Sequence, residues 1–207
     1  MKYSDTDILE ALESGQIEID PPVPPEGIGA VSVDLALGDH FRVFRSTFTG
    51  AIDLAPPGTG GPAIDFDRIM DDLVVPEGEA FVLNPGGFAL GITRQRVRLS
   101  AGLAGRLDGR SSLARVGLMV HATAHTIDPG WNGRITLEFF NCGPLPLMLR
   151  PGMRICALSF EVVKTPTSKP YSSAPSSKYK DQHSPIPSRI TRDRQDGCGS
   201  DTDTGAA

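Results

Sequence analysis

Alternating apolar and polar positions run through most of this chain and predict short β-strands. From Val31 to Leu37, Val and Leu alternate with Ser, Asp and Ala, which is the period of a strand with one buried face. Pro and Gly lie at nearly every junction between such segments, as the turns of an antiparallel sheet require. The further segments of this kind are FRVF, AFVLNP, GFALGIT, RVRL, GRITLEFF, LPLML and ICALSFEVV. The pattern predicts an all-β fold, a single β-sandwich or barrel-like jelly roll.

Helical patterns are few. Residues 4–14 begin with the capping-box sequence S-x-x-D, place apolar residues on one helical face and end before Gly15, so they predict a short N-terminal helix. The Gly- and Pro-rich residues 55–63 predict a flexible loop, and residues 64–72 (IDFDRIMDD) predict a second short helix after it.

The domain organisation follows from where apolar residues become sparse. With 207 residues, 39% of them hydrophobic, the chain can bury one sizeable core. Apolar residues thin out after Val163. We therefore expect a β domain over residues 1–163 and a polar C-terminal arm over 164–190 that cannot form a core of its own. Residues 191–207 are expected to be a disordered extension.

Charge and cysteine content limit which partners the protein can bind and in which cellular compartment we expect it. A formal net charge of −5 argues against broad binding to nucleic acid or to an anionic membrane. The N-terminal sequence MKYSDTDILEALESG is too charged for a signal peptide, and a run of about 18 apolar residues is lacking, so we expect a cytoplasmic protein. The three cysteines are odd in number and widely separated, which predicts neither a disulfide framework nor a CxxC metal site.

One carboxylate is notable for the strand that carries it. In GRITLEFFN, alternation puts Ile, Leu and Phe on one face and Thr136, Glu138 and Phe140 on the other. Both faces then carry large apolar groups, which predicts a central strand. Glu138 is a solvated surface group unless its surroundings remove it from water, and a partly desolvated carboxylate is suited to accepting a proton from a water molecule.

Basic and hydroxyl side chains gather around tight glycine turns in GRLDGRSSLARVGL. Arg110 and Arg115 bracket the segment SSLA, whose serines lie at a predicted first helical turn. Backbone N–H groups and hydroxyls at such a turn can receive phosphate oxygens. A solvated loop is the alternative interpretation of the same residues.

Imidazole and carboxylate groups follow in HATAHTIDPGW. His121 and His125 are four residues apart, a spacing that favours zinc on a helix but decides nothing among turn and strand signals. Neither begins H-x-E, and P-C-x-x-C does not occur, so the signature of zinc-dependent nucleobase deaminases is missing. Asp128 is either a turn residue before proline or a ligand contact, and Trp131 is either a core residue or a stacking partner.

Together these motifs resemble the bacterial dCTP deaminase family of the dUTPase-like superfamily. The resemblance rests on VSVDLALGDHFRVF, LDGRSSLARVGLMVHATAHTIDPGW, ITLEFFN, LPLMLRPGM and the arm pattern PY, KY, Q and SRI. It extends from the first helix to Ile190. It implies a distorted jelly roll that forms a homotrimer with sites near subunit boundaries, and the conversion of dCTP to dUTP and ammonia without zinc.

The resemblance also implies roles for matching residues near the reacting base. Glu138 would be the general base that activates water for attack on C4 of cytosine. Ser111 and Arg115 would orient that water and the pyrimidine. The loop that would bind substrate, including its phosphate, consists of Arg110, Ser111, Ser112, Leu113, Ala114 and Arg115.

Further roles implied by the resemblance fall outside that loop. Asp128 would hold the deoxyribose hydroxyl, and the backbone around Thr136 and Leu137 would read the base edge. The arm would close as a lid over the triphosphate, although composition alone describes it as a solvated linker. The arm residues that would reach the triphosphate are Tyr171, Lys178 and Gln182. Mg2+ would accompany the triphosphate, and dTTP is implied as a feedback inhibitor.

Two other functions are alternatives. A bifunctional enzyme of the same superfamily would carry dCTP through to dUMP and pyrophosphate, but the stretch HATAHTIDPGW is more similar to the monofunctional form. A catalytically silent trimer that senses deoxynucleotides would keep the fold, but Glu138 beside an intact RSSLAR motif argues against it.

Overall fold

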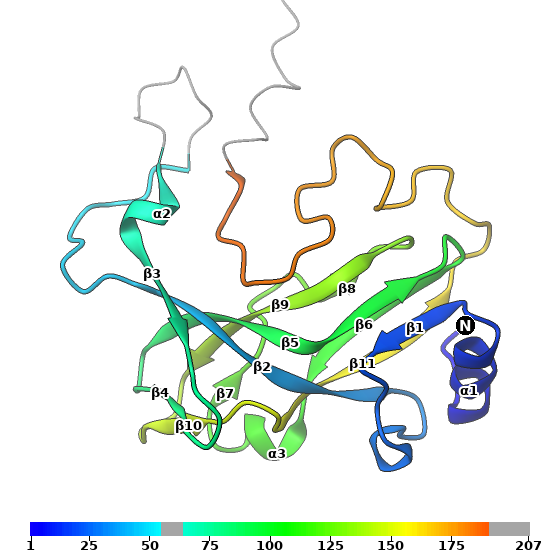
Figure 1. Cartoon of the computed structure of the whole chain (residues 1–207), viewed down its shortest axis with the longest axis horizontal. Coiled ribbons are helices and arrows are strands. Elements are labelled where there is room, and N and C mark those ends of the chain that lie inside the picture. Colours follow the sequence, from blue (N-terminus) through cyan, green and yellow to red (C-terminus); the bar gives the residue numbers. More distant parts are fainter. Residues whose placement is uncertain (55–63, 191–207) are drawn as a thin grey trace, which may run out of the picture.

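The computed structural model describes residues 1–54 and 64–190 of the chain (Figure 1). The loop expected at 55–63 and the extension expected at 191–207 lie outside the described residues. The helices are α1 (Asp5–Glu13), α2 (Phe66–Ile69) and α3 (Ser111–Ala114), with a 3-10 turn at Pro25–Gly27. The strands are β1 (Ile17–Asp20), β2 (Val33–Phe44), β3 (Met70–Val74), β4 (Phe81–Leu83), β5 (Phe88–Leu99), β6 (Leu103–Gly109), β7 (Leu118–Met119), β8 (Thr126–Ile127), β9 (Asn132–Asn141), β10 (Leu147–Leu149) and β11 (Arg154–Val162).

Antiparallel pairing joins nine of the strands in the described residues into one curled sheet (Figure 1). Its order is β7-β9-β5-β2-β11-β6-β8, with β1 paired to β5 and β3 paired to β2. Strands β10 and β4 form a separate antiparallel pair. The expected all-β class with a short N-terminal helix is therefore confirmed. Among the described residues, no helix is both long and apolar enough to cross a membrane.

The period-two pattern predicted most buried faces but divided the longest strands, and it failed at Val31, which lies before β2 and is exposed. Val33, Leu35 and Leu37 are fully buried, as alternation requires. Residues 33–37 and 41–44 belong to the single strand β2, and residues 88–93 and 96–99 belong to the single strand β5. Register shifts interrupt both strands, so one continuous strand changes its pairing without ending.

The helix expected over residues 64–72 is wrong beyond Ile69. Residues 66–69 form α2, but the chain continues as β3 from Met70. Residues 70–74 pair along one edge with β2, and Arg42 bonds Asp72 in the opposite position. Tertiary pairing thus overrides a helical pattern that is only one turn long. The N-terminal helix is confirmed, with both hydrogen bonds of its capping box present.

The C-terminal arm packs on the β domain although it forms no helix or strand over 164–189 (Figure 1). The N–H of Tyr171 donates to Pro129 O at 2.9 Å, and the N–H of Asp181 donates to Asn132 O at 3.1 Å. The N–H of Arg134 donates in turn to the carbonyl of Gln182 at 3.0 Å. These backbone hydrogen bonds hold the arm along the first residues of β9.

A glycine ends the α3 turn and fixes its orientation. Gly117 has φ +94°, and a Cβ there would overlap the backbone of Gly143. Gly117→Ala is expected to lower the free energy of unfolding by about 2–5 kcal/mol, measured by urea denaturation. Two costs add: the strain of a left-handed backbone at a residue with a side chain, and the overlap of the new Cβ with Gly143. The control Gly78→Ala has φ +83° and nothing within 4 Å of its Cβ, so about 1–2 kcal/mol is expected. Equal losses would contradict the role of the Gly143 contact.

Candidate functional site

Glu138 lies on the wall of a largely apolar cavity of about 540 Å3, called here the Glu138 cavity. Strands β2, β5 and β9, helix α2 and the arm all contribute to it. Its apolar wall is formed mainly by Phe44, Phe66, Met70, Phe88, Leu90, Ile127, Trp131 and Ile135. Its polar groups include Thr136, Glu138 and Gln182. A cavity with apolar walls and few polar groups suits a flat organic ring that is recognised at its edge.

The environment of Glu138 follows from its place in β9. Alternation buries Ile135, Leu137 and Phe139, while Glu138 is half-buried on the opposite face. Its Oε2 accepts a hydrogen bond from the backbone N–H of Ala122 at 3.0 Å. Within the described residues this carboxylate has no ion pair. Glu138 is therefore oriented by one neutral donor and keeps acceptor capacity for another molecule.

Gln182 joins the arm to the same cavity. Its side chain is only 4% exposed, which is unusual for an amide in a polar segment. Its Nε2 donates to Arg134 O at 2.7 Å, and its Oε1 accepts from the Thr136 hydroxyl at 3.2 Å. Leu137, between Thr136 and Glu138 in β9, is fully buried and does not line the cavity.

A second cavity, of about 470 Å3, lies beneath the arm and is called here the Lys178 cavity. A turn at residues 128–131 forms part of its wall. In this turn Trp131 N donates to Asp128 O at 3.0 Å, and Gly130 follows proline with φ +78°, as in a type II turn. The residues that line the cavity are Asp128, Pro129, Thr167, Lys169, Tyr171, Ala174, Ser176, Ser177, Lys178 and Tyr179.

Aromatic packing fixes Tyr171 at this cavity. Its ring lies against Trp131 with centroids 5.1 Å apart. Burial raises the pKa of the Tyr171 phenol, which accepts a hydrogen bond from Tyr179 N at 3.0 Å. Trp131 is a buried core residue whose ring packs, tilted by 44°, against Tyr171, and a contact of Trp131 with a ligand stays a prediction.

The RSSLAR residues lie elsewhere in the single chain. α3 is at the bottom of Figure 1, whereas the arm is at the top. Ser111, Ser112 and Arg115 are exposed on α3 or directly after it, with Ala114 exposed and Leu113 half-buried. Asp34 on β2 holds Arg110, since Oδ2 accepts from Arg110 Nη1 at 2.5 Å. None of these α3 residues lines the Glu138 cavity or the Lys178 cavity.

The structure thus distributes the expected site residues over three places: the Glu138 cavity, the Lys178 cavity and the exposed turn at α3. Thr136, Glu138 and Gln182 meet at the Glu138 cavity, and Leu137 lies buried in β9 between Thr136 and Glu138. Asp128, Tyr171 and Lys178 meet at the Lys178 cavity. Sequence reasoning assigned no role to Tyr179, which lines both cavities, and its aromatic ring within a polar arm was the available signal.

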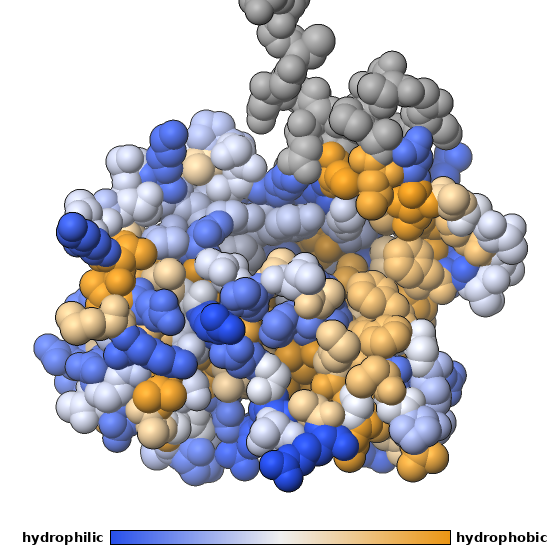
Figure 2. Space-filling model, turned by 180° about the vertical axis from the view of Figure 1, so that it is seen from behind, coloured by the Kyte–Doolittle hydropathy of each residue, from blue (hydrophilic) through white to orange (hydrophobic). Residues whose placement is uncertain are grey.

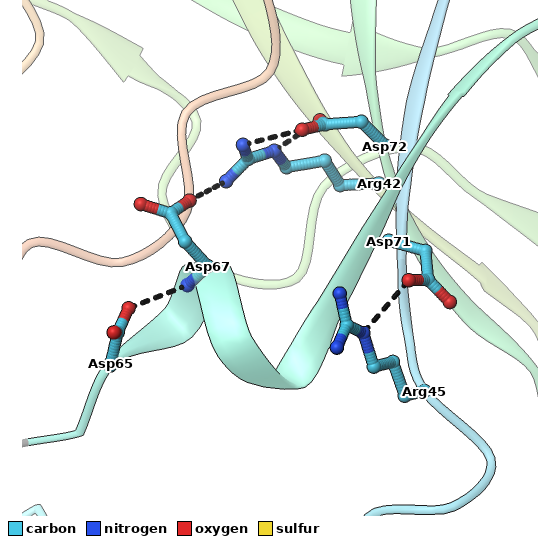
Figure 3. A network of polar contacts seen from close by, with 6 residues as sticks. All are labelled: Arg42, Arg45, Asp65, Asp67, Asp71 and Asp72. Carbon is cyan, nitrogen blue, oxygen red and sulfur yellow. Dashed lines mark hydrogen bonds and ion pairs between the residues drawn. The ribbon is translucent and has the colours of Figure 1, made fainter.

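An ion-pair network holds α2 beside the Glu138 cavity (Figure 3). Arg42 on β2 donates to both carboxylate oxygens of Asp72, at 2.5 and 2.8 Å, and to Asp67 at 2.8 Å. Hydrogen bonding to Asp72 raises the pKa of Arg42. Arg45 adds a bond of 2.8 Å to Asp71. Because α2 and β3 carry Phe66 and Met70 of the cavity wall, the network positions that wall; sequence reasoning had not identified it.

An apolar patch adjoins the Glu138 cavity across four strands. Phe44, Phe88, Met119 and Phe140 are each 36–40% exposed. Phe140 pairs with both Phe88 and Met119 in the sheet, and the Phe44 and Phe88 rings lie 6.1 Å apart. Hydrophobic side chains also gather on one side of the face in Figure 2. A contiguous exposed apolar surface of this kind is typical of an interaction surface.

Residues 121–125 contain no helix, so the four-residue spacing of His121 and His125 has no helical meaning. Their ring centroids are 5.9 Å apart. In the part of the chain that the structure describes, no three or more His, Cys, Asp or Glu side chains are grouped so that they could hold a metal ion.

Comparison with known proteins decides the family. A family model described as dCTP deaminase-like matches residues 3–163. The chain belongs to the dCTP deaminase-like family. Two curated relatives agree with this membership. A dCTP deaminase of Rhodospirillum rubrum is 64% identical over 94% of this chain and 99% of the relative. A dCTP deaminase of Aeromonas salmonicida is 52% identical over 93% of this chain and 100% of the relative.

A solved structure supports the fold of this dCTP deaminase-like chain. The 2′-deoxycytidine 5′-triphosphate deaminase of Agrobacterium tumefaciens matches with a TM-score of 0.59 and 20% identity. The match covers 78% of this chain and 48% of that protein, so the similarity spans about half of that protein's length. The family resemblance inferred from the motifs is confirmed, and the roles of individual residues stay predictions.

Proposed function

We propose that this protein hydrolyses dCTP to dUTP and ammonia in the bacterial cytoplasm, with Glu138 as the general base and without zinc. One observation carries the proposal. A half-buried carboxylate, held by a single backbone N–H, lies on the wall of a mainly apolar cavity in a chain 64% identical to a curated dCTP deaminase. The product dUTP would feed the supply of dUMP for thymidylate synthesis.

The proposed reaction needs only proton transfers at the cytosine ring. Glu138 accepts one proton from water as the water oxygen bonds to C4. The carboxyl group passes that proton to N3, and the second water proton goes to the departing amino group. Ammonia then leaves, and C4 keeps the carbonyl oxygen. A positioned general base of this kind typically contributes about a hundred- to ten-thousand-fold in rate.

The two cavities fit the two ends of the nucleotide in this proposal. The cytosine would enter the Glu138 cavity, where the backbone at Thr136 and Leu137 reads its edge. Asp128 would hold the deoxyribose hydroxyl at the mouth of the Lys178 cavity. Tyr171 and Lys178 would contact the triphosphate, which enters as its Mg2+ complex, and Gln182 would close the arm beside Thr136. A closed arm excludes water, which strengthens the polar contacts beneath it.

The exposed α3 residues complete the site from a neighbouring copy in a homotrimer. Arg115 and Ser111 of one subunit would orient the water and the pyrimidine bound by the next, and Arg110 and Ser112 would contact phosphate. Two observations support this assembly: α3 lines neither cavity of its own chain, and the apolar patch adjoins the Glu138 cavity. A charged guanidinium beside C4 stabilises the negative charge that develops there.

Product analysis tests the proposal. We expect dCTP with Mg2+ to release ammonia and accumulate dUTP, whereas CTP, dCMP and dUTP release little, and a zinc-selective chelator changes nothing. Chelator-dependent loss of activity would contradict the zinc-free mechanism. Formation of dUMP and pyrophosphate would support the bifunctional alternative, and tight binding of dCTP without ammonia release would support the sensor. Adding dTTP to the same assay tests the expected feedback inhibition.

A further inference from the structure

Tyr179 lies between the two cavities of the site. Within the described residues, it is the one residue that lines both the Glu138 cavity and the Lys178 cavity. Its side chain is partly buried against the core of the β domain. Tyr179 therefore lies between the space that holds Glu138 and the space that holds Lys178.

The phenol and the backbone of Tyr179 close two consecutive loops of the arm. Its backbone N–H donates to the Tyr171 hydroxyl at 3.0 Å, which closes the loop over residues 171–179. Its own hydroxyl accepts a hydrogen bond from the N–H of Arg189 at 3.1 Å, which closes the loop over residues 179–189. Tyr179 thus holds two loops of the arm, a segment in which no strand forms.

The side chain of Arg189 reinforces this closure. Its guanidinium lies 5.8 Å from the centroid of the Tyr179 ring, within the range of a cation–π contact. It also donates to the backbone carbonyl of Lys178. The end of the arm is therefore attached to the residue pair 178–179 through its backbone and its side chain.

Each loop carries a different part of the site. The first loop includes Lys178 and begins at Tyr171, both of which line the Lys178 cavity. The second loop includes Gln182, which is bonded to Thr136 beside Glu138. Since both loops meet at Tyr179, a displacement of this residue moves the groups of the two cavities together.

We propose that Tyr179 is a positioning residue that couples the two cavities, so that the arm closes over the triphosphate and the base as one unit. The identity of the nucleotide rests on the proposed function. The coupling itself rests on two parts of the Tyr179 side chain, the hydroxyl that bonds Arg189 N and the ring that lies beside the Arg189 guanidinium. It predicts that the hydroxyl affects substrate binding, and that the ring also affects turnover.

Tyr179→Phe tests the hydroxyl, and Tyr3→Phe is the matched control because Tyr3 lies in the N-terminal segment, away from both cavities. We expect Tyr179→Phe to raise the KM for dCTP about three- to tenfold, with kcat within about twofold, because one hydrogen bond is lost. The calorimetric Kd should rise by the same factor when it is measured in the Glu138→Gln background, in which dCTP is not consumed. Amide hydrogen exchange at Arg189 should become faster, measured by mass spectrometry. Tyr3→Phe should change none of these values.

Tyr179→Leu tests the ring. Loss of the Tyr179 ring is expected to open the Glu138 cavity to the Lys178 cavity and to water. We therefore expect kcat to fall about tenfold or more, in addition to the rise in KM. If amide hydrogen exchange at Arg189 becomes faster in Tyr179→Phe and Tyr179→Leu while the KM and Kd for dCTP stay unchanged, Tyr179 has only a structural role. That result would overturn the proposal. Unchanged exchange in Tyr179→Phe would overturn it as well.

Failure of the proposed function has a different result. If wild-type protein binds dCTP and releases no ammonia, the deaminase proposal fails, while the effect of Tyr179→Phe on the Kd still decides the coupling. If wild-type protein does not bind dCTP, both proposals are wrong.

Discussion

Glu138→Gln is expected to lower the rate of ammonia release from dCTP by at least about two orders of magnitude while dCTP still binds. The amide has the shape of the carboxylate, and its oxygen can still accept the hydrogen bond from Ala122 N. It cannot accept a proton from water at neutral pH, so the proposed attacking species does not form. The measurement is the initial rate of ammonia release, with the dCTP Kd measured separately by calorimetry.

The control for this variant is Glu161→Gln, because Glu161 is also a strand glutamate but lies exposed on β11, outside both cavities. It should keep the wild-type rate. Thermal unfolding of both variants near the wild-type temperature shows that the fold is retained. Normal ammonia release from Glu138→Gln would remove Glu138 from the mechanism.

The strand that carries Glu138 could be predicted because its information is local. The period of two along GRITLEFFN assigns a face to each residue without any knowledge of neighbouring strands, and β9 buries Ile135, Leu137 and Phe139 as expected. The helix expected over 64–72 failed for the opposite reason. Its second half is decided by β2, which lies more than twenty residues earlier in the sequence.

The arm shows why composition alone describes a docked segment incorrectly. Its residues are polar, and their average predicts a solvated linker. Its position is set by single contacts that an average does not register, above all the burial of Gln182 and the ring contact between Tyr171 and Trp131. The family resemblance named Tyr171, Lys178 and Gln182 one by one, and their roles as anchors of a lid stay predictions.

The cavity wall could not be predicted from the sequence. Phe44, Phe66 and Phe88 come from three different elements, and each fits the pattern of an ordinary core residue. Only the register between strands shows that they surround one space. The same holds for Arg42 and its partners, whose pairing depends on the β2–β3 register and on the position of α2.

The separation of Arg115 from the Glu138 cavity leads to the second large expected effect. Arg115→Ala alone is expected to lose most activity, and so is Glu138→Gln alone. In a mixed trimer, a site that combines an intact Glu138 from one subunit with an intact Arg115 from its neighbour should work. Random mixing of equal amounts of the two chains makes about a quarter of the sites intact, since each site needs the correct chain at two positions.

The experiment co-expresses the two inactive chains with different affinity tags, isolates mixed trimers through both tags and measures ammonia release per site. Each mixed trimer then has one intact site in three, so we expect about a third of the wild-type rate per site, at least tenfold above either unmixed variant. A site built within one chain gives no recovery, because every chain then carries one damaged residue in its own site. Recovery therefore distinguishes a site shared between copies from a rearrangement of α3 within a single subunit, and its absence would contradict the proposed subunit boundary.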